Sequence, residues 1–184
     1  MISRFFKDSK AVRIVAAILA IIWMVIIFSF SNQDADASGA VSQSVSYRMV
    51  EASANFLHLE WAGEKIQAVA DRIENGVRKA AHMTEYAILA FFIGTAVNAW
   101  GWWKNASAGI KFPVGHIINA IICMLYAASD EWHQTFIPGR NGAVKDVFID
   151  AAGSVIAIVV IIGITSLVRK RKMRMALSSE AMNE

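Results

Sequence analysis

The stretch "AVRIVAAILAIIWMVIIFSF", residues 11–30, has Arg13 as its only charged residue. A helix of about 20 mostly apolar residues crosses the hydrocarbon core of a bilayer. The basic residues before this stretch and the small residues after it also suit a signal peptide. However, the apolar core of a signal peptide is only about 7–15 residues long. The length of the stretch therefore predicts a retained membrane anchor.

The composition of the whole chain agrees with a membrane protein. Of the 184 residues, 56% are hydrophobic and 18% are charged, which is more apolar than an ordinary soluble domain. The single cysteine, Cys123, lies inside an apolar run and cannot form an intrachain disulfide, so we expect it to pack in the core. The length indicates one domain.

Three further apolar runs follow, at residues 80–99, 113–128 and 147–168. The last is long enough to cross a membrane, whereas the other two fit only if their polar ends lie at the membrane interface. With only two prolines in the chain, long helices are unobstructed, and Pro113 is a suitable first helical residue. The sequence therefore predicts an all-α fold with four transmembrane helices.

The basic residues predict the orientation of these helices, because cytoplasmic segments of membrane proteins are enriched in lysine and arginine. With both termini in the cytoplasm, eleven of the 18 basic residues fall on the cytoplasmic side. They are Arg4, Lys7, Lys10, Arg13, Lys104, Lys111, Arg169, Lys170, Arg171, Lys172 and Arg174. Residues 31–79 and 129–146 then lie outside. We interpret the basic tail, residues 169–184, as a topology signal that also attracts anionic lipid, not as a nucleic-acid site.

The segment between the first two runs, residues 34–77, predicts an extracytoplasmic helical insert. Ile66, Val69, Ile73 and Val77 recur at helical spacing with charged residues on the other faces, which indicates an amphipathic helix on the outer leaflet or on the bundle. This helix is expected to continue through Gly76 into the run at 80–99. A weaker helical pattern precedes it, at Val41, Val45, Met49 and Phe56.

Three polar motifs lie where the predicted spans meet the outer face. "RKAAHMTEY" (78–86) opens the second span, "SDEWHQ" (129–134) ends the third, and "DVFID" (146–150) opens the fourth. Each has several of its polar residues at i, i+3 or i+4 spacing, so they share helix faces. Between the last two, Pro138 and Gly139 in "FIPGR" predict a turn that presents Arg140. Gly153 continues the face of the fourth span and permits close helix contact. Charged residues in spans are functional candidates, so we expect a shared polar pocket.

The residue types suggest a role for each side chain in this pocket. For proton transfer the candidates are His82, Glu85, Asp130 and His133. For binding a phosphate or other polar ligand they are Arg78, Lys79, Tyr86, Glu131, Gln134, Arg140, Asp146 and Asp150. Two histidines on separate helices are a weak metal signal, so neither a metal nor a cofactor is expected. Two alternatives stay open: a binding or scaffold protein without turnover, and charge pairs that only hold the helices together. In these pairs Arg78 would meet Asp130 or Asp146, and Arg140 would meet Glu131 or Asp150. We expect at least one guanidinium to lie within salt-bridge range of an acid on another helix.

Two long motifs, "RKAAHMTEYAIL" and "SDEWHQTFIPGRNGAVKDVFIDAAG", together with "FSFSNQ" (28–33), resemble the VanZ-like family of bacterial integral membrane proteins. The resemblance covers residues 12–165. It identifies residues 1–168 as a VanZ-like four-helix membrane domain followed by the basic tail. The residues that match the family's motifs are Arg78, Lys79, His82, Glu85, Tyr86, Ser129, Asp130, Glu131, Gln134, Phe136, Pro138, Gly139, Arg140, Asp146, Asp150 and Gly153.

The resemblance implies a multi-pass protein of the bacterial cytoplasmic membrane with a role in the cell envelope. The family is named after a protein associated with resistance to teicoplanin, a glycopeptide that binds cell-wall precursors outside the membrane. The expected partners are therefore the lipid bilayer and either a lipid-linked cell-wall precursor or a phospholipid headgroup. The resemblance implies no defined reaction.

Overall fold

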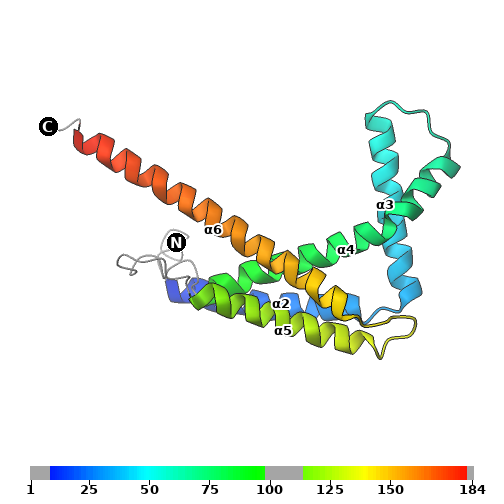
Figure 1. Cartoon of the computed structure of the whole chain (residues 1–184), viewed down its shortest axis with the longest axis horizontal. Coiled ribbons are helices and arrows are strands. Elements are labelled where there is room, and N and C mark those ends of the chain that lie inside the picture. The colour runs from blue at the N-terminus through cyan, green and yellow to red at the C-terminus, as the bar shows by residue number, and fades with distance from the viewer. Residues whose placement is uncertain (1–8, 98–113, 182–184) are drawn as a thin grey trace.

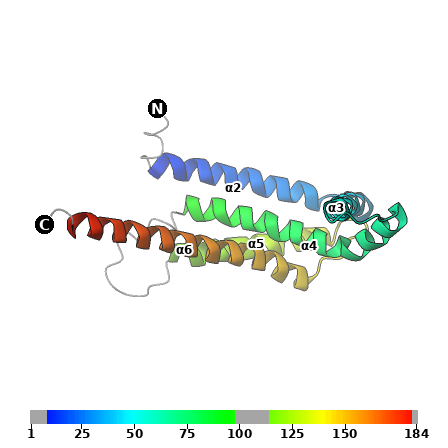
Figure 2. The same ribbon diagram turned by 90° about the horizontal axis from the view of Figure 1, so that it is seen from above.

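The computed structural model describes residues 9–97 and 114–181, and within these ranges it contains five helices and no strand. The helices are α2 (Ser9–Ser31), α3 (Ala35–Phe56), α4 (Gly63–Ala96), α5 (Val114–Gln134) and α6 (Val144–Ala181). Figures 1 and 2 show α2, α5, the second half of α4 and the first half of α6 side by side as a bundle. The prediction of an all-α fold is confirmed.

Two of the described helices contain segments that are long and apolar enough to cross a membrane, at Ala11–Ser31 and Val144–Leu167. The other two predicted spans fall largely in α4 and α5, but residues 98–113, including "WGWWK" and Pro113, lie outside the described residues. The four-span topology therefore stays a prediction. α6 begins at Val144 and is helical to Ala181, so the described part of the predicted tail continues the last helix.

The core of the bundle lies around α4, which packs against α2, α3, α5 and α6. Tyr86, Leu89 and Ala90 of α4 are fully buried, and Cys123 of α5 is buried among them as predicted. The outward faces of α2 and α6 are apolar, with residues such as Ile21 and Val159 exposed. A bundle whose outer surface is as apolar as its interior is suited to a lipid environment, where every backbone polar group is satisfied within its own helix.

Gly153 of α6 lies directly against the backbone of α4. A Cβ atom built at Gly153 would overlap the backbone carbonyl of Met83. The prediction that this glycine permits close helix contact is confirmed.

Hydrogen bonds from side chains to backbone carbonyls connect the helices of the bundle. The Tyr126 hydroxyl of α5 donates to the carbonyl of Met24 in α2 at 2.6 Å, and the Trp23 indole donates to the carbonyl of Glu85 at 2.9 Å. The Asn119 amide of α5 donates to the carbonyl of Ala90 at 2.8 Å. These bonds satisfy polar side chains that would otherwise be buried without a partner.

One end of the bundle carries a projection, which we call the arm and which consists of α3 and residues 63–76 of α4. Figures 1 and 2 show α3 running across the long direction of the bundle. The Asp34 side chain caps α3 by accepting a hydrogen bond from the amide of Ala37 at 2.7 Å. α4 is one continuous helix, so the predicted amphipathic helix does run through Gly76 into the second predicted span.

The structure confirms that the weaker pattern at residues 41–56 is helical, but the residues of that pattern do not make the contact with α4. The buried residues of α3 are Ser42, Ser46, Val50 and Ala54, whereas Val41, Val45, Met49 and Phe56 are exposed. Small side chains allow the two helices to approach closely, and the Ser42 hydroxyl donates to the carboxylate of Glu74. The apolar side of α3 is therefore left without a protein partner in the described parts of the chain.

Candidate functional site

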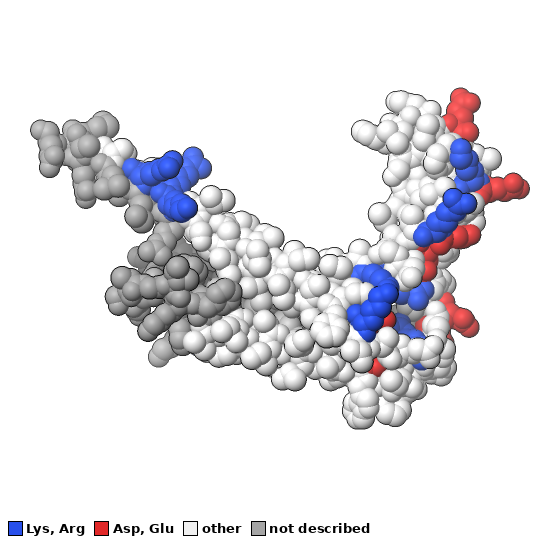
Figure 3. All heavy atoms as spheres, viewed as in Figure 1, with Lys and Arg blue, Asp and Glu red and all other residues white. Residues whose placement is uncertain are grey.

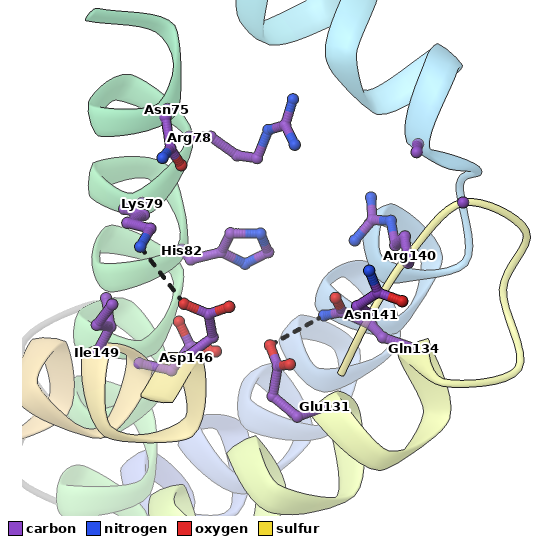
Figure 4. Close-up of a pocket in the computed structure, with 13 residues that line it drawn as sticks. Asn75, Arg78, Lys79, His82, Glu131, Gln134, Arg140, Asn141, Asp146 and Ile149 are labelled. Atoms are coloured by element: carbon purple, nitrogen blue, oxygen red, sulfur yellow. Dashed lines mark hydrogen bonds and ion pairs between the residues drawn. The ribbon is translucent and has the colours of Figure 1, made fainter. Parts of the chain in front are cut away.

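A pocket opens where the arm meets the end of the bundle, with a cavity volume of about 180 Å³. Its side chains come from the start of α3, from α4, from the end of α5, from the loop at residues 135–143 and from the start of α6. Figure 4 shows Arg78 and His82 extending from α4 into the space that faces Arg140 and Asn141. The lining residues are Ala35, Asn75, Arg78, Lys79, His82, Glu131, Gln134, Gly139, Arg140, Asn141, Asp146, Ile149 and Asp150.

The loop that carries Arg140 is fixed against the start of the arm. Gly139 has a φ of +74°, and a Cβ atom there would lie 2.9 Å from the Cβ of Ala35. The amide of Ala35 donates to the carbonyl of Pro138 at 3.3 Å. The predicted turn is therefore present, and glycine is required both for its conformation and for its close contact. Arg140 is presented to the pocket as a result.

The three cationic side chains of the pocket differ in their partners. The Arg78 Nη2 atom lies 2.5 Å from Glu74 Oε1 on the same helix, and the Lys79 Nζ atom lies 3.6 Å from Asp146 Oδ1 of α6. The Arg140 guanidinium makes only a long hydrogen bond, 3.4 Å, to the carbonyl of Phe30, and it has no ion pair among the described residues.

These partners differ from the expected ones. Pairs of Arg78 with Asp130 or Asp146, and of Arg140 with Glu131 or Asp150, are absent from the described ion pairs. Glu74 is one turn before Arg78 on the same helix face and so reaches it first. The expectation of a guanidinium paired with an acid across the helices is therefore wrong, and Lys79 makes the link between α4 and α6 instead.

Burial alters the charges that face the cavity. Glu131 accepts hydrogen bonds from the Ala143 amide at 2.9 Å and from the Gln134 side chain at 3.3 Å. Burial raises the pKa of the Glu131 carboxyl above its usual value, although the Ala143 amide opposes this shift. Burial also lowers the pKa of the Arg140 guanidinium, and the positive charge of Arg78 adds to the effect. An arginine nonetheless remains protonated in proteins.

The helices that form the cavity also carry buried polar groups without partners. Asp150 and Asp130 are each 2% exposed and Tyr86 is fully buried, and each has at least one polar atom without a hydrogen-bond partner in the described structure. His82 Nδ1 lies 3.5 Å from Glu85 Oε2, within ion-pair range but without hydrogen-bond geometry. Burial raises the pKa of the Asp130 carboxyl, and Gln134 donates to it at 3.2 Å. Buried polar atoms without partners are exceptions that need an explanation, such as a ligand.

The structure brings together some of the sequence-predicted residues and separates others. Arg78, Lys79, His82, Glu131, Gln134, Arg140, Asp146 and Asp150 line one cavity, whereas Glu85, Tyr86, Asp130 and His133 do not line it. The His133 ring stacks on Phe28 with ring centroids 4.5 Å apart and lies 3.3 Å from the side-chain oxygen of Asn32. The two histidines therefore do not face one ligand site together.

Two polar lining residues, Asn75 and Asn141, are absent from the sequence prediction. Asn75 precedes Arg78 by three residues and Lys79 by four, so helical spacing would have placed it on the same face. Asn141 follows Arg140 in the loop and has no periodic signal. His82, Glu85 and Asp130 do not form part of any cluster of three or more potential metal ligands in the described ranges. The expectation that no metal binds stays a prediction.

The described residues form only helices, and two of these helices are apolar and long enough to cross a membrane, which suggests a helical membrane protein. The family model described as VanZ/LLP1 matches residues 16–168, and the chain belongs to this family. The matched region includes every residue that lines the pocket. No curated protein and no solved structure gives a significant match to the chain.

Proposed function

We propose that this pocket binds the phosphate-bearing headgroup of an envelope lipid or of a lipid-linked cell-wall precursor at the extracytoplasmic face of the bacterial cytoplasmic membrane. The observation that carries the proposal is the Arg140 guanidinium. It is half-buried, lines the cavity and has no carboxylate partner among the described ion pairs. Partial burial of a cation without a counter-ion is unfavourable, and a bound anion would reduce that cost.

Arginine is well suited to this role because its planar guanidinium can donate two parallel hydrogen bonds to a phosphate. Arg78 lies across the cavity from Arg140, as Figure 4 shows, and Lys79 adds a third positive charge. One phosphate between the two guanidinium groups would receive donors from α4 and from the loop at the same time.

The charge distribution along α6 supports the orientation. Asp150 lines the pocket near the start of α6, and Lys170 follows it by 20 residues on the same helix. At a rise of 1.5 Å per residue this separation is about 30 Å, which is about the thickness of the hydrocarbon core. With the basic end of α6 in the cytoplasm, the pocket would face the other side.

A catalytic role is the second candidate, and the observation that favours it is the position of His82. His82 lines the cavity and lies beside Glu85, so it could transfer a proton to or from a bound ligand. A nucleophile is harder to assign. The Ser129 hydroxyl is exposed and donates to the carbonyl of Tyr126 at 2.8 Å, as a serine near a helix end does. Binding therefore explains more of the site than turnover does.

The proposal can be tested by native mass spectrometry of the full-length protein in mild detergent. The two probes are a polyprenyl phosphate and the polyprenol that lacks the phosphate. We expect a bound species with the phosphate only, and we expect Arg140→Lys to weaken binding about tenfold, or 1.4 kcal/mol, because a lysine cannot donate two parallel hydrogen bonds. Arg72→Lys is the matched control, since Arg72 is exposed on the arm. Equal binding of both probes would contradict the proposal.

Thermal stability of Arg140→Lys and of a further variant, Lys79→Met, distinguishes ligand binding from a purely structural role of the charges. Lys79 and Asp146 connect two helices, so Lys79→Met is expected to lower thermal stability. Arg140 has no such partner, so Arg140→Lys should reduce binding without lowering the melting temperature. If the loss of binding in Arg140→Lys came with an equal loss of stability, the charges would be better explained as structural. If the pocket holds a wall precursor, changes in teicoplanin susceptibility would follow from that binding.

A further inference from the structure

The pocket is lined by as many carboxyl groups as strongly basic side chains. Its cations are Arg78, Lys79 and Arg140, and its carboxylates are Glu131, Asp146 and Asp150. A ligand that carried only a phosphate would gain from the cations, but it would also come close to the carboxylates. Like charges at short distance in a partly buried site are costly, so the carboxylates need an explanation in terms of the ligand.

Internal pairing already balances some of these charges, although a paired guanidinium keeps N–H donors for a ligand. Lys79 is paired with Asp146, and Arg78 is paired with Glu74 outside the cavity. Among the charged lining groups, one cation and two buried carboxyl groups remain without an ion pair in the described chain. The cation is Arg140, and the carboxyl groups are those of Glu131 and Asp150.

Asp150 gives the independent observation. The residue is 2% exposed, it lines the cavity, and its Oδ2 atom has no hydrogen-bond partner among the described residues. A carboxylate is an acceptor only, so the group that completes it must be a donor. His82, Glu131, Asp130 and Asp146 are the titratable groups whose charges act on it. None of them donates a hydrogen bond to that oxygen atom.

We propose that the ligand of this pocket is zwitterionic, with a phosphate held by Arg140 and Arg78 and a primary ammonium group held by Asp150 and Glu131. This inference rests on the proposed phosphate-binding function and makes the ligand class narrower. An ammonium group has three N–H donors and so can bond to both carboxylates at once. A quaternary amine has no N–H donor and would leave the Asp150 oxygen unsatisfied. Phosphoethanolamine, free or as a lipid headgroup, has the required chemistry.

The experiment is isothermal titration calorimetry of the full-length protein in detergent. The soluble probes are O-phosphoethanolamine, phosphocholine and inorganic phosphate, and dihexanoyl phosphatidylethanolamine is the lipid probe. We expect O-phosphoethanolamine to bind about tenfold more tightly than either of the other soluble probes, the minimum expected for a close charge pair. If only the lipid probe binds, with the same requirement for the acids, the proposal holds with a lipid headgroup as the source.

Substitutions test whether Asp150 and Glu131 bind the ammonium group of the ligand. Asp150→Asn should abolish the preference for O-phosphoethanolamine over inorganic phosphate, and Glu131→Gln should reduce it if Asp150→Asn does not fold. Asp36→Asn, at an exposed acid in the first turn of α3, is the control and should keep the preference. Equal, Arg140-dependent binding of phosphate and O-phosphoethanolamine would refute the zwitterion and leave the phosphate site intact. Failure of every phosphate-bearing probe to bind would refute both.

A second inference comes from the arm and does not depend on the pocket. One side of α3 and the turn after it expose large apolar side chains, with Phe56 84% and Val41 59% exposed. The set, which we call the α3 stripe, is Val41, Val45, Met49, Phe56 and Leu57. Single exposed apolar residues are ordinary, but a run of them at helical spacing marks an interaction surface.

The position of the arm identifies the partner. α3 runs across the end of the bundle and projects sideways from it (Figures 1 and 2). Figure 3 shows the charged side chains of the arm on the side away from α6. The side of the arm that faces α6 shows no charged side chains in this view. That side adjoins the region where lipid would surround the exposed apolar face of α6, which includes Val155 and Val159.

We infer that the α3 stripe lies in the lipid leaflet next to the pocket end of the bundle. An interfacial helix buries its apolar face at the boundary between headgroups and acyl chains and keeps its charges in water. The occupant of this surface is therefore the bilayer itself. The arm would hold the bundle at a fixed depth, with the pocket at the level of the lipid headgroups.

Fluorescence quenching in phosphatidylcholine–phosphatidylglycerol vesicles tests this inference. A dye attached at Met49→Cys in a Cys123→Ser background should be quenched by lipids with bromine on their acyl chains. A dye at Arg72→Cys, on the arm but at an exposed charged position, should be quenched by aqueous iodide instead. Quenching of residue 49 by iodide as strong as at residue 72 would refute the inference. Disulfide-linked dimers through residue 49 at low protein-to-lipid ratio would assign the stripe to a second copy and also refute it.

Discussion

The packing of α6 against α4 depends on one missing side chain. Gly153 of α6 lies against the backbone of Met83 in α4, and an added Cβ atom would overlap the Met83 carbonyl and crowd its Cα atom at 2.7 Å. A side chain could rotate away from such an overlap, but backbone atoms of a helix cannot. Gly153→Ala therefore requires α4 and α6 to separate along the contact that also holds the Lys79–Asp146 pair.

The magnitude follows from two opposing effects. Overpacking of a well-packed interface costs about 1–3 kcal/mol, and an overlap with backbone belongs at the upper end of that range. Alanine gains at most about 1 kcal/mol over glycine in helix propensity. The net loss of unfolding free energy should be about 2 kcal/mol, which corresponds to a fall of about 4–8 °C in melting temperature for a chain of this size.

Thermal unfolding in one detergent, followed by circular dichroism, measures this effect. Gly163→Ala is the matched control in the same helix, because a Cβ atom at Gly163 meets nothing within 4 Å. Its melting temperature should stay the same or rise. If Gly153→Ala proved as stable as Gly163→Ala, the close packing of α4 on α6 would be wrong, and with it the position of Asp146 and Asp150 in the pocket.

Three further predictions concern orientation, charge and helix contacts. A cysteine introduced at Asn141 in a Cys123→Ser background should react with a membrane-impermeant maleimide in intact cells. Burial raises the pKa of Glu131 above its ordinary 4.5, so the folded state binds this proton more tightly than the unfolded state does. The free energy of unfolding should therefore fall as the pH rises from 4.5 through the folded pKa. Glu131→Gln should make this pH dependence weaker in thermal melts. Tyr126→Phe removes the 2.6 Å hydrogen bond to the Met24 carbonyl and should cost about 0.6–1.5 kcal/mol in chemical unfolding.

Each of these has a control. A cysteine at Lys170 should react only after permeabilisation, and the reverse pattern would invert the proposed topology. Glu51→Gln, at an exposed acid on α3, should leave the pH slope unchanged, and an equal effect of both variants would contradict the role of burial. Tyr47→Phe removes a hydroxyl from the arm, outside the bundle, and a loss as large as that of Tyr126→Phe would show that the bond to Met24 contributes little.

The helices themselves could be predicted because their signals are local. Unbroken apolar runs, helical spacing and the scarcity of proline are all properties of neighbouring residues, and they located the starts of α2, α5 and α6 to within a few residues. The ends of α5 and α6, at Gln134 and Ala181, lie well beyond the predicted spans, because polar residues continue a helix past its apolar run. The turn at Gly139 could be predicted for the same reason. What the apolar pattern missed was which side of α3 packs on α4. In water an apolar stripe predicts the protein contact, but beside a membrane lipid can cover that stripe while serines such as Ser42 and Ser46 pack against the neighbouring helix.

The site shows the same division between local and distant information. Helical spacing correctly grouped Arg78, Lys79 and His82, and the motif ends brought Glu131, Arg140 and Asp150 to the same cavity. The ion pairs could not be predicted, since opposite signs on three helices allow many combinations and only the rotation of each helix selects one. The rotation of α5 turns His133 toward Phe28 and away from the cavity. Gln134, the next residue in the "SDEWHQ" motif, lines the cavity instead.

Glu74 connects the arm to the pocket. Its Oε1 atom accepts hydrogen bonds from both the Ser42 hydroxyl of α3 and the Arg78 guanidinium, and the Arg78 Nη2 atom also lies 3.4 Å from that hydroxyl. The same guanidinium also lies beside Gly39 of α3, where an added Cβ atom would be at an ordinary contact distance of 3.6 Å from Nη2. The position of α3 therefore determines where one of the pocket's cations can lie. If α3 rests in the leaflet, the depth of the arm in the lipid and the shape of the pocket are set by the same contact.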